Sequence, residues 1–286
     1  MPWVVRLAIP VKFGMQLRKL LRLNRSLKTR GVIGTLKHYA DVVAGLVIST
    51  TPGARRERER RRVLDLAFAK KREAIDADFD GHHGLDTGGK IELADLSIES
   101  ETKEHGAFYQ AVFPDRFRHW IDSLYIEPSE FLFVDIGAGK GRALFLAQDL
   151  GFKGVVGVEF AKELVEICKK NIRVREVECA HRPPVSIVHM DALVYLLPDE
   201  PTVLFINNPF GQEVMGMFVE RVRESLQRAP RPFKIVYGNS VCDQVVMSGI
   251  PGLRRLANTE EFNSYEWVGA ETDLRLAANV RGVSRQ

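Results

Sequence analysis

The sequence predicts an α/β fold: a doubly wound, mostly parallel seven-stranded sheet with a C-terminal antiparallel hairpin, preceded by a helical N-terminal extension. From residue 131 onward, short runs rich in Val, Ile and Phe alternate with amphipathic stretches. Strands that are apolar throughout and separated by helices form parallel sheets covered on both faces. The chain has 286 residues, 45% of them hydrophobic, which is enough to bury such a core.

The N-terminal segment differs from the rest of the chain in charge. Residues 1–75 contain 18 Lys and Arg residues and five acidic residues, a formal charge of +13, which leaves −9 on the remainder. We expect residues 1–77 to form a basic helical extension. Its run RRERERRR continues into residues that recur at helical spacing and predict a narrow packing stripe, namely Val63, Leu66, Ala67 and Ala74.

A basic extension of this kind has several possible roles. It can dock an acidic partner or a membrane surface through residues 1–75, or it can simply cover part of the body. No zinc finger or aromatic RNA-binding motif accompanies it, so binding of nucleic acid would rest on charge alone. The three cysteines and seven histidines show no metal-ligand spacing, no signal peptide is recognisable, and the apolar runs are shorter than the ~20 residues of a membrane span. We therefore expect a cytoplasmic protein without a metal centre.

The body of the protein is expected to comprise residues 78–286, with a core at about 131–270. Residues 78–106 are predicted as a turn-rich connector that carries His82 and His83 in a surface loop. The next segment, 106–126, predicts one helix that lies against the sheet, because its large apolar residues recur at helical spacing. These residues are Phe113, Phe117, Trp120, Ile121 and Leu124.

The remaining elements alternate between strands and helices, except that no helix is predicted between the third and the fourth strand. Strands are predicted at 131–135, 155–159, 185–189, 203–207 and 233–238, and helices at 141–151, 161–172, 212–227 and 240–249. The last two runs, LRRLAN and SYEWVGA, are separated by a short polar turn. They predict the hairpin that closes the sheet.

Three glycines occupy the first strand-to-helix turn, in the stretch FVDIGAGKGRA. Ligands of doubly wound sheets bind at this turn, and glycine allows the backbone to adopt positive φ or to touch a ligand. A dinucleotide fingerprint would require a third glycine where this chain has Arg142, and a P-loop would require a Lys-Ser/Thr pair that is absent. The pattern that remains is D-x-G-x-G-x-G, made by Asp135, Gly137, Gly139 and Gly141.

This pattern resembles motif I of the class I S-adenosylmethionine-dependent methyltransferases. The resemblance implies that the turn, including Ala138, admits the methionine end of S-adenosylmethionine and that Asp135 holds its amino group. Glu159, which ends the second strand 24 residues after Asp135, would bind the ribose hydroxyls. Asp191 with Ala192, after the third strand, would bind the adenine. Tyr109 is either an aromatic cover for the cofactor or a plain core tyrosine.

The fourth strand ends in Asn207-Asn208-Pro209-Phe210. This run is similar to the N-P-P-[YF] motif of amino-methylating members, in which an Asn side chain and a Pro carbonyl orient the target amine, although the second proline is missing. It is also similar to the Asn-Asn-x-x-Phe run of Rossmann-type histone-lysine methyltransferases. These four residues are the candidate catalytic set. The alternative is a plain turn in which Asn208 caps and Pro209 starts the following helix.

Three functional hypotheses follow. The first is transfer of a methyl group to nitrogen, for example on the side chain of a protein lysine or glutamine. The second is a small-molecule oxygen or carbon acceptor. A hydroxyl acceptor would require a general base, and His189, near the end of the third strand, is expected to be a partly buried polar residue rather than that base. The third is a cofactor-binding module without transferase activity that docks a membrane or an acidic partner. The motifs D-x-G-A-G-K-G-R and N-P-F further resemble a bacterial group within the class I methyltransferases.

Overall fold

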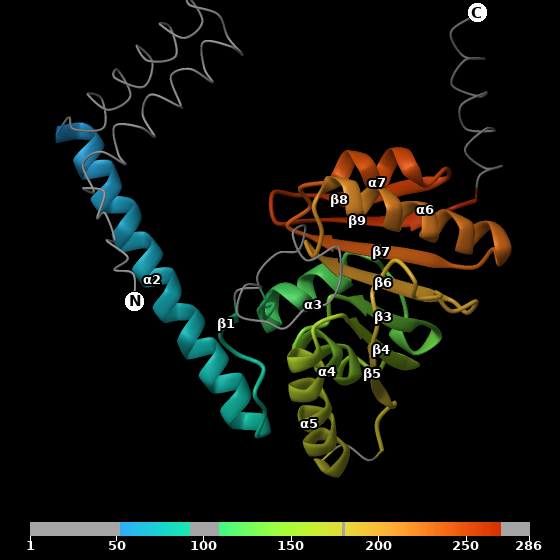
Figure 1. Ribbon diagram of the computed structural model, residues 1–286, viewed down its shortest axis with the longest axis horizontal. Coiled ribbons are helices and arrows are strands. Elements are labelled where there is room, and N and C mark those ends of the chain that lie inside the picture. Colours follow the sequence, from blue (N-terminus) through green and yellow to red (C-terminus); the bar gives the residue numbers. More distant parts are fainter. Residues whose placement is uncertain (1–51, 92–108, 179–180, 270–286) are drawn as a thin grey trace, which may run out of the picture. The chain divides into compact units, whose positions relative to one another are not determined.

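The computed structural model describes residues 52–91, 109–178 and 181–269 (Figure 1). The chain divides into two compact units, residues 1–70 and 71–286. Helix α2 (Pro52–His83) supplies the described part of the first unit and continues into the second. The short basic helices predicted upstream of residue 52 lie outside the described residues. In the part that is described, no helix is both long and apolar enough to cross a lipid bilayer.

The predicted α/β fold is confirmed. The seven-stranded sheet has the order β5-β4-β3-β6-β7-β9-β8, in which the first five strands are parallel and the last two pair antiparallel. The hairpin of β8 and β9 therefore closes the sheet as expected. The strands are β3 (Leu132–Ile136), β4 (Gly154–Glu159), β5 (Val185–His189), β6 (Thr202–Asn207), β7 (Phe233–Gly238), β8 (Leu253–Asn258) and β9 (Phe262–Trp267).

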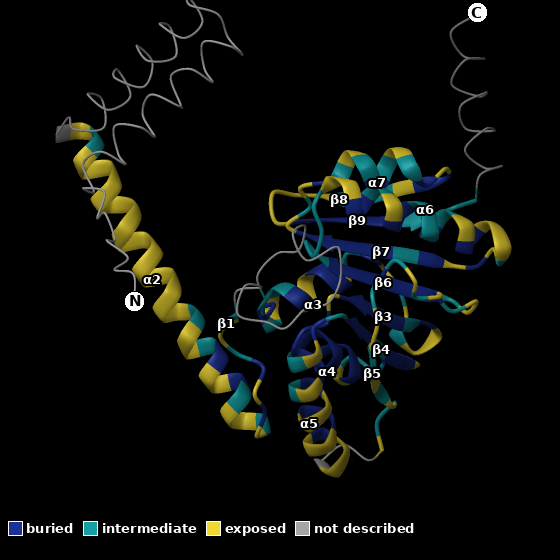
Figure 2. Cartoon of the chain, in the orientation of Figure 1, coloured by how far each residue is buried: buried dark blue, intermediate teal, exposed yellow. Residues whose placement is uncertain are grey.

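Helices cover both faces of this sheet, so its central strands are buried (Figure 2). Phe133 packs in a core cluster with residues of α3, α4 and α5, whereas its neighbour Val134 packs in a second cluster with residues of α6 and α7. Successive strand residues point to opposite faces, which explains this division. The helices are α3 (Pro114–Asp122), α4 (Arg142–Asp149), α5 (Lys162–Glu178), α6 (Gln212–Arg228) and α7 (Asp243–Gly249), with a 3-10 turn at Pro128–Glu130.

The winding of the chain defines where a ligand can bind. From β3 the chain winds outward through β4 to β5 and then returns to β6, on the other side of β3. The strand order reverses at this point, and the connections that follow β3 and β6 diverge to opposite faces. The glycine turn after β3 and the Asn207–Phe210 run after β6 therefore meet at the carboxyl edge of the sheet.

The connector predicted at 78–106 begins differently from expectation. Helix α2 extends through His83, so His82 and His83 lie on its last turn and not in a loop. Gly84, with φ of +64°, follows the helix end. The helix persists through the turn-forming residues because its C-terminal part is held by tertiary contacts: Asp76 and Phe79 are buried. Residues Lys90–Ile91 of the connector form the short strand β1, and residues 92–98 lie outside the described residues.

The packing stripe predicted in α2 is also wrong. Its members, Val63, Leu66, Ala67 and Ala74, are exposed in the structure. Helical spacing alone does not specify which turns find a partner, and here the buried residues lie nearer the C-terminal end of the helix.

The single helix predicted over 106–126 is shorter than expected. Tyr109 and Gln110 form β2 (Tyr109–Gln110), which pairs antiparallel with β1, and α3 begins only at Pro114. Proline suits the first turn of a helix and favours an extended residue before it; Phe113 accordingly has φ −72° and ψ 137°. The aromatic spacing was nevertheless informative, since Phe117 and Trp120 are buried against the sheet.

Candidate active site at the carboxyl edge of the sheet

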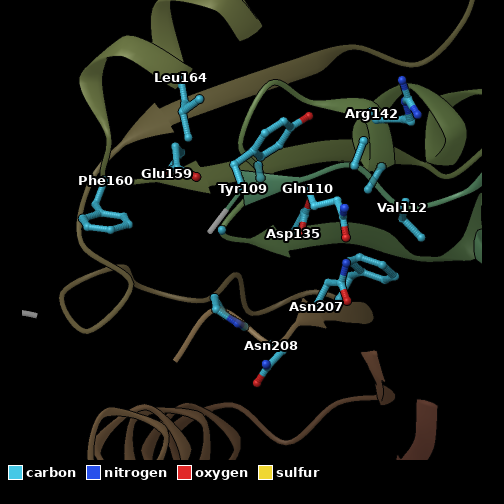
Figure 3. A pocket seen from close by; sticks show the side chains of 16 residues that line it. Tyr109, Gln110, Val112, Asp135, Arg142, Glu159, Phe160, Leu164, Asn207 and Asn208 are labelled. Atoms are coloured by element: carbon cyan, nitrogen blue, oxygen red, sulfur yellow. The ribbon is translucent and has the colours of Figure 1, made fainter. Parts of the chain in front are cut away.

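A cavity, here called the central cavity, lies at the carboxyl ends of β3, β4 and β6 (Figure 3). Asp135 and Glu159 face this space from neighbouring strands, and Gln110 and Asn207 are drawn beside Asp135 in this view. The lining brings together residues from four separate parts of the chain. They are Tyr109, Gln110, Ala111, Val112, Asp135, Gly137, Ala138, Arg142, Ala143, Glu159, Phe160, Leu164, Phe205, Asn207, Asn208 and Pro209.

The backbone amides of the glycine turn are already engaged within the protein. The N–H groups of Gly137 and Ala138 donate to the carbonyl of Val158 at 2.9 and 3.1 Å. The Gly139 N–H donates to Glu159 Oε2 at 2.8 Å, and the Gly141 N–H donates to the Ala138 carbonyl at 2.9 Å. In phosphate-binding turns such amides point at the ligand. This turn is therefore poorly suited to a pyrophosphate, in agreement with its departure from the dinucleotide pattern.

Two buried carboxyl groups give the central cavity its charge preference. Asp135 is 4% exposed and Glu159 is 3% exposed. Burial raises the pKa of Asp135 well above its usual range, and the nearby charge of Glu159 raises it further. Burial also raises the pKa of Glu159, while backbone N–H donors, first that of Ala161, act in the opposite direction. A cation that entered the cavity would stabilise both carboxylates, whereas an anion would be repelled.

Tyr109 is fixed directly over the glycine turn. A Cβ at Gly139, whose φ is +56°, would overlap the Tyr109 ring, so this position requires glycine for both conformation and space. The Tyr109 hydroxyl donates to the Thr87 carbonyl at 2.6 Å, and burial raises the pKa of the phenol. The ring therefore lines the central cavity in a defined position.

Gly141 shapes the turn from the side away from the ligand. It caps the N-terminus of α4 with φ of +94°, and a Cβ there would lie 2.6 Å from Cys168 Sγ. Burial raises the pKa of the Cys168 thiol to about 12, so it packs as a neutral group. Neither Gly139 nor Gly141 lines the central cavity, which contains Asp135, or the neighbouring slot, which contains Asp191.

An apolar slot adjoins the central cavity and shares Gly137, Phe160 and Pro209 with it. Its other lining residues are Val158, Met190, Asp191, Ala192 and Phe210. Asp191 stands at this slot with Oδ1 accepting the Leu193 N–H at 2.9 Å. Phe210 lines the slot, where its ring lies 5.5 Å from that of Phe218, whereas Asn207 and Asn208 line the central cavity and Pro209 lines both.

The two asparagines at the end of β6 are held differently. Asn207 Oδ1 accepts a hydrogen bond from Asn239 Nδ2 at 2.8 Å. Asn208 has φ of +50°, and its Oδ1 atom is buried without a hydrogen-bond partner in the described part of the chain. Helix α6 begins at Gln212 with Gly211 as its N-cap, so the alternative in which Asn208 caps and Pro209 starts the helix is wrong. An unsatisfied buried acceptor at a cavity is available to a ligand donor.

A further cavity, here called the arginine cavity, adjoins the central cavity and shares Asn207, Asn208 and the segment 110–112 with it. The sequence alone did not predict that Arg72, Arg116 and Trp120 line a common cavity. Arg72 comes from α2 and Arg116 and Trp120 from α3, and no local motif could indicate that these helices meet beside β6. Its full lining is Arg72, Gln110, Ala111, Val112, Phe113, Arg116, Trp120, Asn207, Asn208 and Asn239.

Arg142, the residue that breaks the dinucleotide pattern, anchors the glycine turn to the end of α2. Its guanidinium is 1% exposed and forms ion pairs with Asp76 and Asp80, while Nε donates to Thr87 Oγ1 at 2.7 Å. Lys140 of the same turn adds an ion pair with Asp86 at 2.7 Å. The segment from Asp76 to Gly88, here called the anchor segment, is thus tied to the turn by buried charges.

His189, by contrast, is exposed and contacts the Phe160 carbonyl at 3.1 Å.

Comparisons with known proteins give partial likenesses. No family model matches the chain. It is 35% identical over 126 residues to a histone-lysine N-methyltransferase specific for lysine 79 of histone H3 from Dictyostelium discoideum, a match that covers 39% of this chain and 7% of that protein. Among solved structures, an RNA methyltransferase from Salinibacter ruber in complex with S-adenosyl-L-homocysteine is 21% identical, with a TM-score of 0.36 over 54% of this chain and 88% of the other. Magnesium protoporphyrin IX methyltransferase from Synechocystis PCC 6803 with bound SAM is 12% identical, with a TM-score of 0.38 over 54% and 76%.

Proposed function

We propose that the protein is an S-adenosylmethionine-dependent methyltransferase of the class I type, acting in the cytoplasm on a nitrogen acceptor. The observation that carries the proposal is the pair of buried acids, Asp135 and Glu159, at the strand ends beside a turn whose amides are used internally. Such a site favours a cationic ligand over a nucleotide pyrophosphate. The matched segment of the Dictyostelium discoideum histone-lysine N-methyltransferase supports the same class.

The described residues fit S-adenosylmethionine along its length. Asp135 would hold the ammonium group. Glu159 would accept the ribose hydroxyls, because the N–H groups of Gly139 and Ala161 leave lone pairs free on its oxygens. The apolar slot would take the adenine ring, with Asp191 beside it. The cofactor supplies an electrophilic methyl group on a sulfonium centre.

The protein's own residues then have to align the acceptor and exclude water. Asn208 Oδ1 is the group best placed to accept a hydrogen bond from an acceptor N–H. Among its described lining residues, the arginine cavity has no carboxylate, histidine or lysine that could serve as a general base. A neutral nitrogen attacks without one, whereas a hydroxyl needs proton removal. These features favour nitrogen over oxygen.

Calorimetric titration with S-adenosylmethionine tests the proposal at the cofactor. Glu159→Gln removes the charge and one acceptor, and we expect it to weaken binding about tenfold to hundredfold. The matched control is Glu166→Gln, which changes an exposed glutamate on α5 and should leave the affinity unchanged. Absence of binding to the wild-type protein would refute the whole assignment.

A second experiment identifies the acceptor class. Cell extract incubated with methyl-labelled S-adenosylmethionine and the protein should yield label in protein, nucleic acid or small molecules, and the bond can then be assigned by its stability to acid and base. Label on oxygen or carbon would replace the nitrogen assignment. Tight cofactor binding without any labelled product would favour the binding module that transfers no methyl group.

A further inference from the structure

The arginine cavity has a chemical character opposite to that of the central cavity. Asp135, Glu159 and Asp191 do not line it, and its charged lining residues are Arg72 and Arg116. We infer that this cavity binds an anionic group of the methyl acceptor, a carboxylate or a phosphate, with these two arginines as its counter-ions. That the anion belongs to the methyl acceptor rests on the proposed function, whereas the anion site itself rests on the contacts described below.

Arg72 lines the arginine cavity and is held in place by contacts with the segment that precedes α3. Its Nη1 atom donates to the Ala111 carbonyl at 2.8 Å, and its guanidinium lies over the Phe113 ring at 4.1 Å. Burial lowers the pKa of Arg72, Asp76 opposes this shift, and the positive charges of Arg142 and Arg116 lower the pKa further. A bound anion would offset the repulsion that Arg116 and Arg142 exert on Arg72.

Arg116 approaches the same aromatic ring from α3. Its guanidinium lies 5.3 Å from the centroid of Phe113, so the two arginines flank one side chain. Arg116 also pairs with Glu261 at 3.0 Å, but the two side chains are 40% and 49% exposed. Exposed pairs of this kind contribute little, so Arg116 can exchange Glu261 for a ligand that also contacts Arg72. A planar guanidinium group can donate two hydrogen bonds to the oxygens of one carboxylate or phosphate, so both arginines can bind the same anion.

The uncharged lining residues indicate the same ligand chemistry. Trp120 is 2% exposed, and its Nε1 atom is buried without a hydrogen-bond partner among the residues that the structure describes. An indole N–H can only donate, so an anionic oxygen satisfies it and an ammonium group does not. Asn208 Oδ1, also shared with the central cavity, can only accept. The two cavities together fit an acceptor with an N–H near the cofactor and an anion farther away.

Trp120 lines the arginine cavity, so the signal of its indole N–H can report binding there. The full-length protein, labelled with nitrogen-15 in tryptophan and saturated with S-adenosyl-L-homocysteine, is titrated with inorganic phosphate, with acetate and with methylammonium. We expect the Trp120 signal, assigned with Trp120→Phe, to shift with phosphate or acetate and to ignore methylammonium. The Trp267 signal, whose N–H already donates to the Pro251 carbonyl at 2.9 Å, should not move. The anion that binds more tightly distinguishes a phosphate site from a carboxylate site.

Arginine variants test whether the shift of the Trp120 signal depends on Arg72 and Arg116, the two proposed counter-ions. Arg72→Gln and Arg116→Gln should each weaken the anion response about tenfold. The matched control is Arg118→Gln, which removes the same charge from an exposed position of α3 outside the cavity and should have no effect. A Trp120 signal that ignores both anions overturns the inference, as does a response that is equal in the Arg72, Arg116 and Arg118 variants.

The cofactor's own carboxylate is the competing occupant. A tenfold loss of S-adenosylmethionine affinity in Arg72→Gln would assign this arginine to the cofactor and overturn the inference, whereas unchanged affinity supports it. The two proposals can also fail separately. If the wild-type protein shows no affinity for S-adenosylmethionine and Trp120 still responds to phosphate or acetate in the absence of S-adenosyl-L-homocysteine, the methyltransferase assignment fails and the anion site stands.

Discussion

At the scale of single residues, the proposed role of Asp135 predicts that cofactor binding depends on pH. Burial, and then the charge of Glu159, raise its pKa in the free protein, so the neutral form persists above the usual range of an aspartic acid. A cationic ligand favours the carboxylate, and binding below the raised pKa therefore releases a proton. The affinity for S-adenosylmethionine should rise with pH, by up to about tenfold per pH unit for one proton, and level off above this pKa.

Calorimetry in buffers of different ionisation enthalpy measures this proton release directly. Asp135→Asn should reduce the release and flatten the pH profile, and the part that remains should come from Glu159, whose pKa is also raised. An affinity that is independent of pH in the wild-type protein would show that the cofactor does not interact with ionised Asp135.

A second prediction for a single residue concerns the substitution of Gly139. Gly139→Ala places a Cβ in the Tyr109 ring at a backbone φ of +56°, so it combines overlap with backbone strain. We expect a loss of about 1–3 kcal/mol in the free energy of unfolding from these two effects, together with weaker cofactor binding. The control is Gly216→Ala in α6, where a Cβ meets nothing within 4 Å. Urea denaturation should show that the control is neutral or slightly stabilised.

At the scale of elements, the strands and the helices after them could be predicted because their signals are local. Apolar β-branched runs and amphipathic stretches fix β3 to β9 within a few residues, and the strand order then brings Asp135, Glu159 and Asn207 to one edge of the sheet. The course of α2 could not be predicted in this way. Its C-terminal part is stabilised by Arg142, which is distant in sequence, and turn-forming residues there resemble a loop.

The anchor segment yields a prediction of its own. Arg142→Met would leave Asp76 and Asp80 beside the glycine turn without their buried counter-ion, and breaking such a pair costs about 3–5 kcal/mol. We expect the protein to unfold at lower urea and to lose part of its cofactor affinity, since Lys140 would then be the one charged residue of the glycine turn that still pairs with the segment. The matched control, Arg173→Met, changes an exposed arginine on α5. Equal stability of the two variants would show that the network is unimportant.

At the scale of the whole molecule, charge and structure divide the chain at different places. The charge asymmetry and the turn signals suggest a basic extension at 1–77 and a body at 78–286, whereas the two compact units meet between Lys70 and Lys71. The difference matters because Asp76 and Asp80 pair with Arg142 of the glycine turn, and Arg72 lines the arginine cavity. Sequence composition detects where charge changes, but it cannot detect which end of a helix is anchored.

Truncation at two points tests which boundary governs function. A chain that begins at Lys71 keeps Arg72 and the whole anchor segment, and we expect it to fold and to bind S-adenosylmethionine with the affinity of the full-length protein. A chain that begins at Gly89 loses Asp76, Asp80 and the Thr87 carbonyl that fixes Tyr109. It should be less stable by several kcal/mol, because Arg142 is then buried without a counter-ion, and its cofactor affinity should fall. Thermal unfolding and calorimetry measure both effects. Loss of binding already in the chain that begins at Lys71 would instead assign residues 1–70 a direct part in forming the cofactor site.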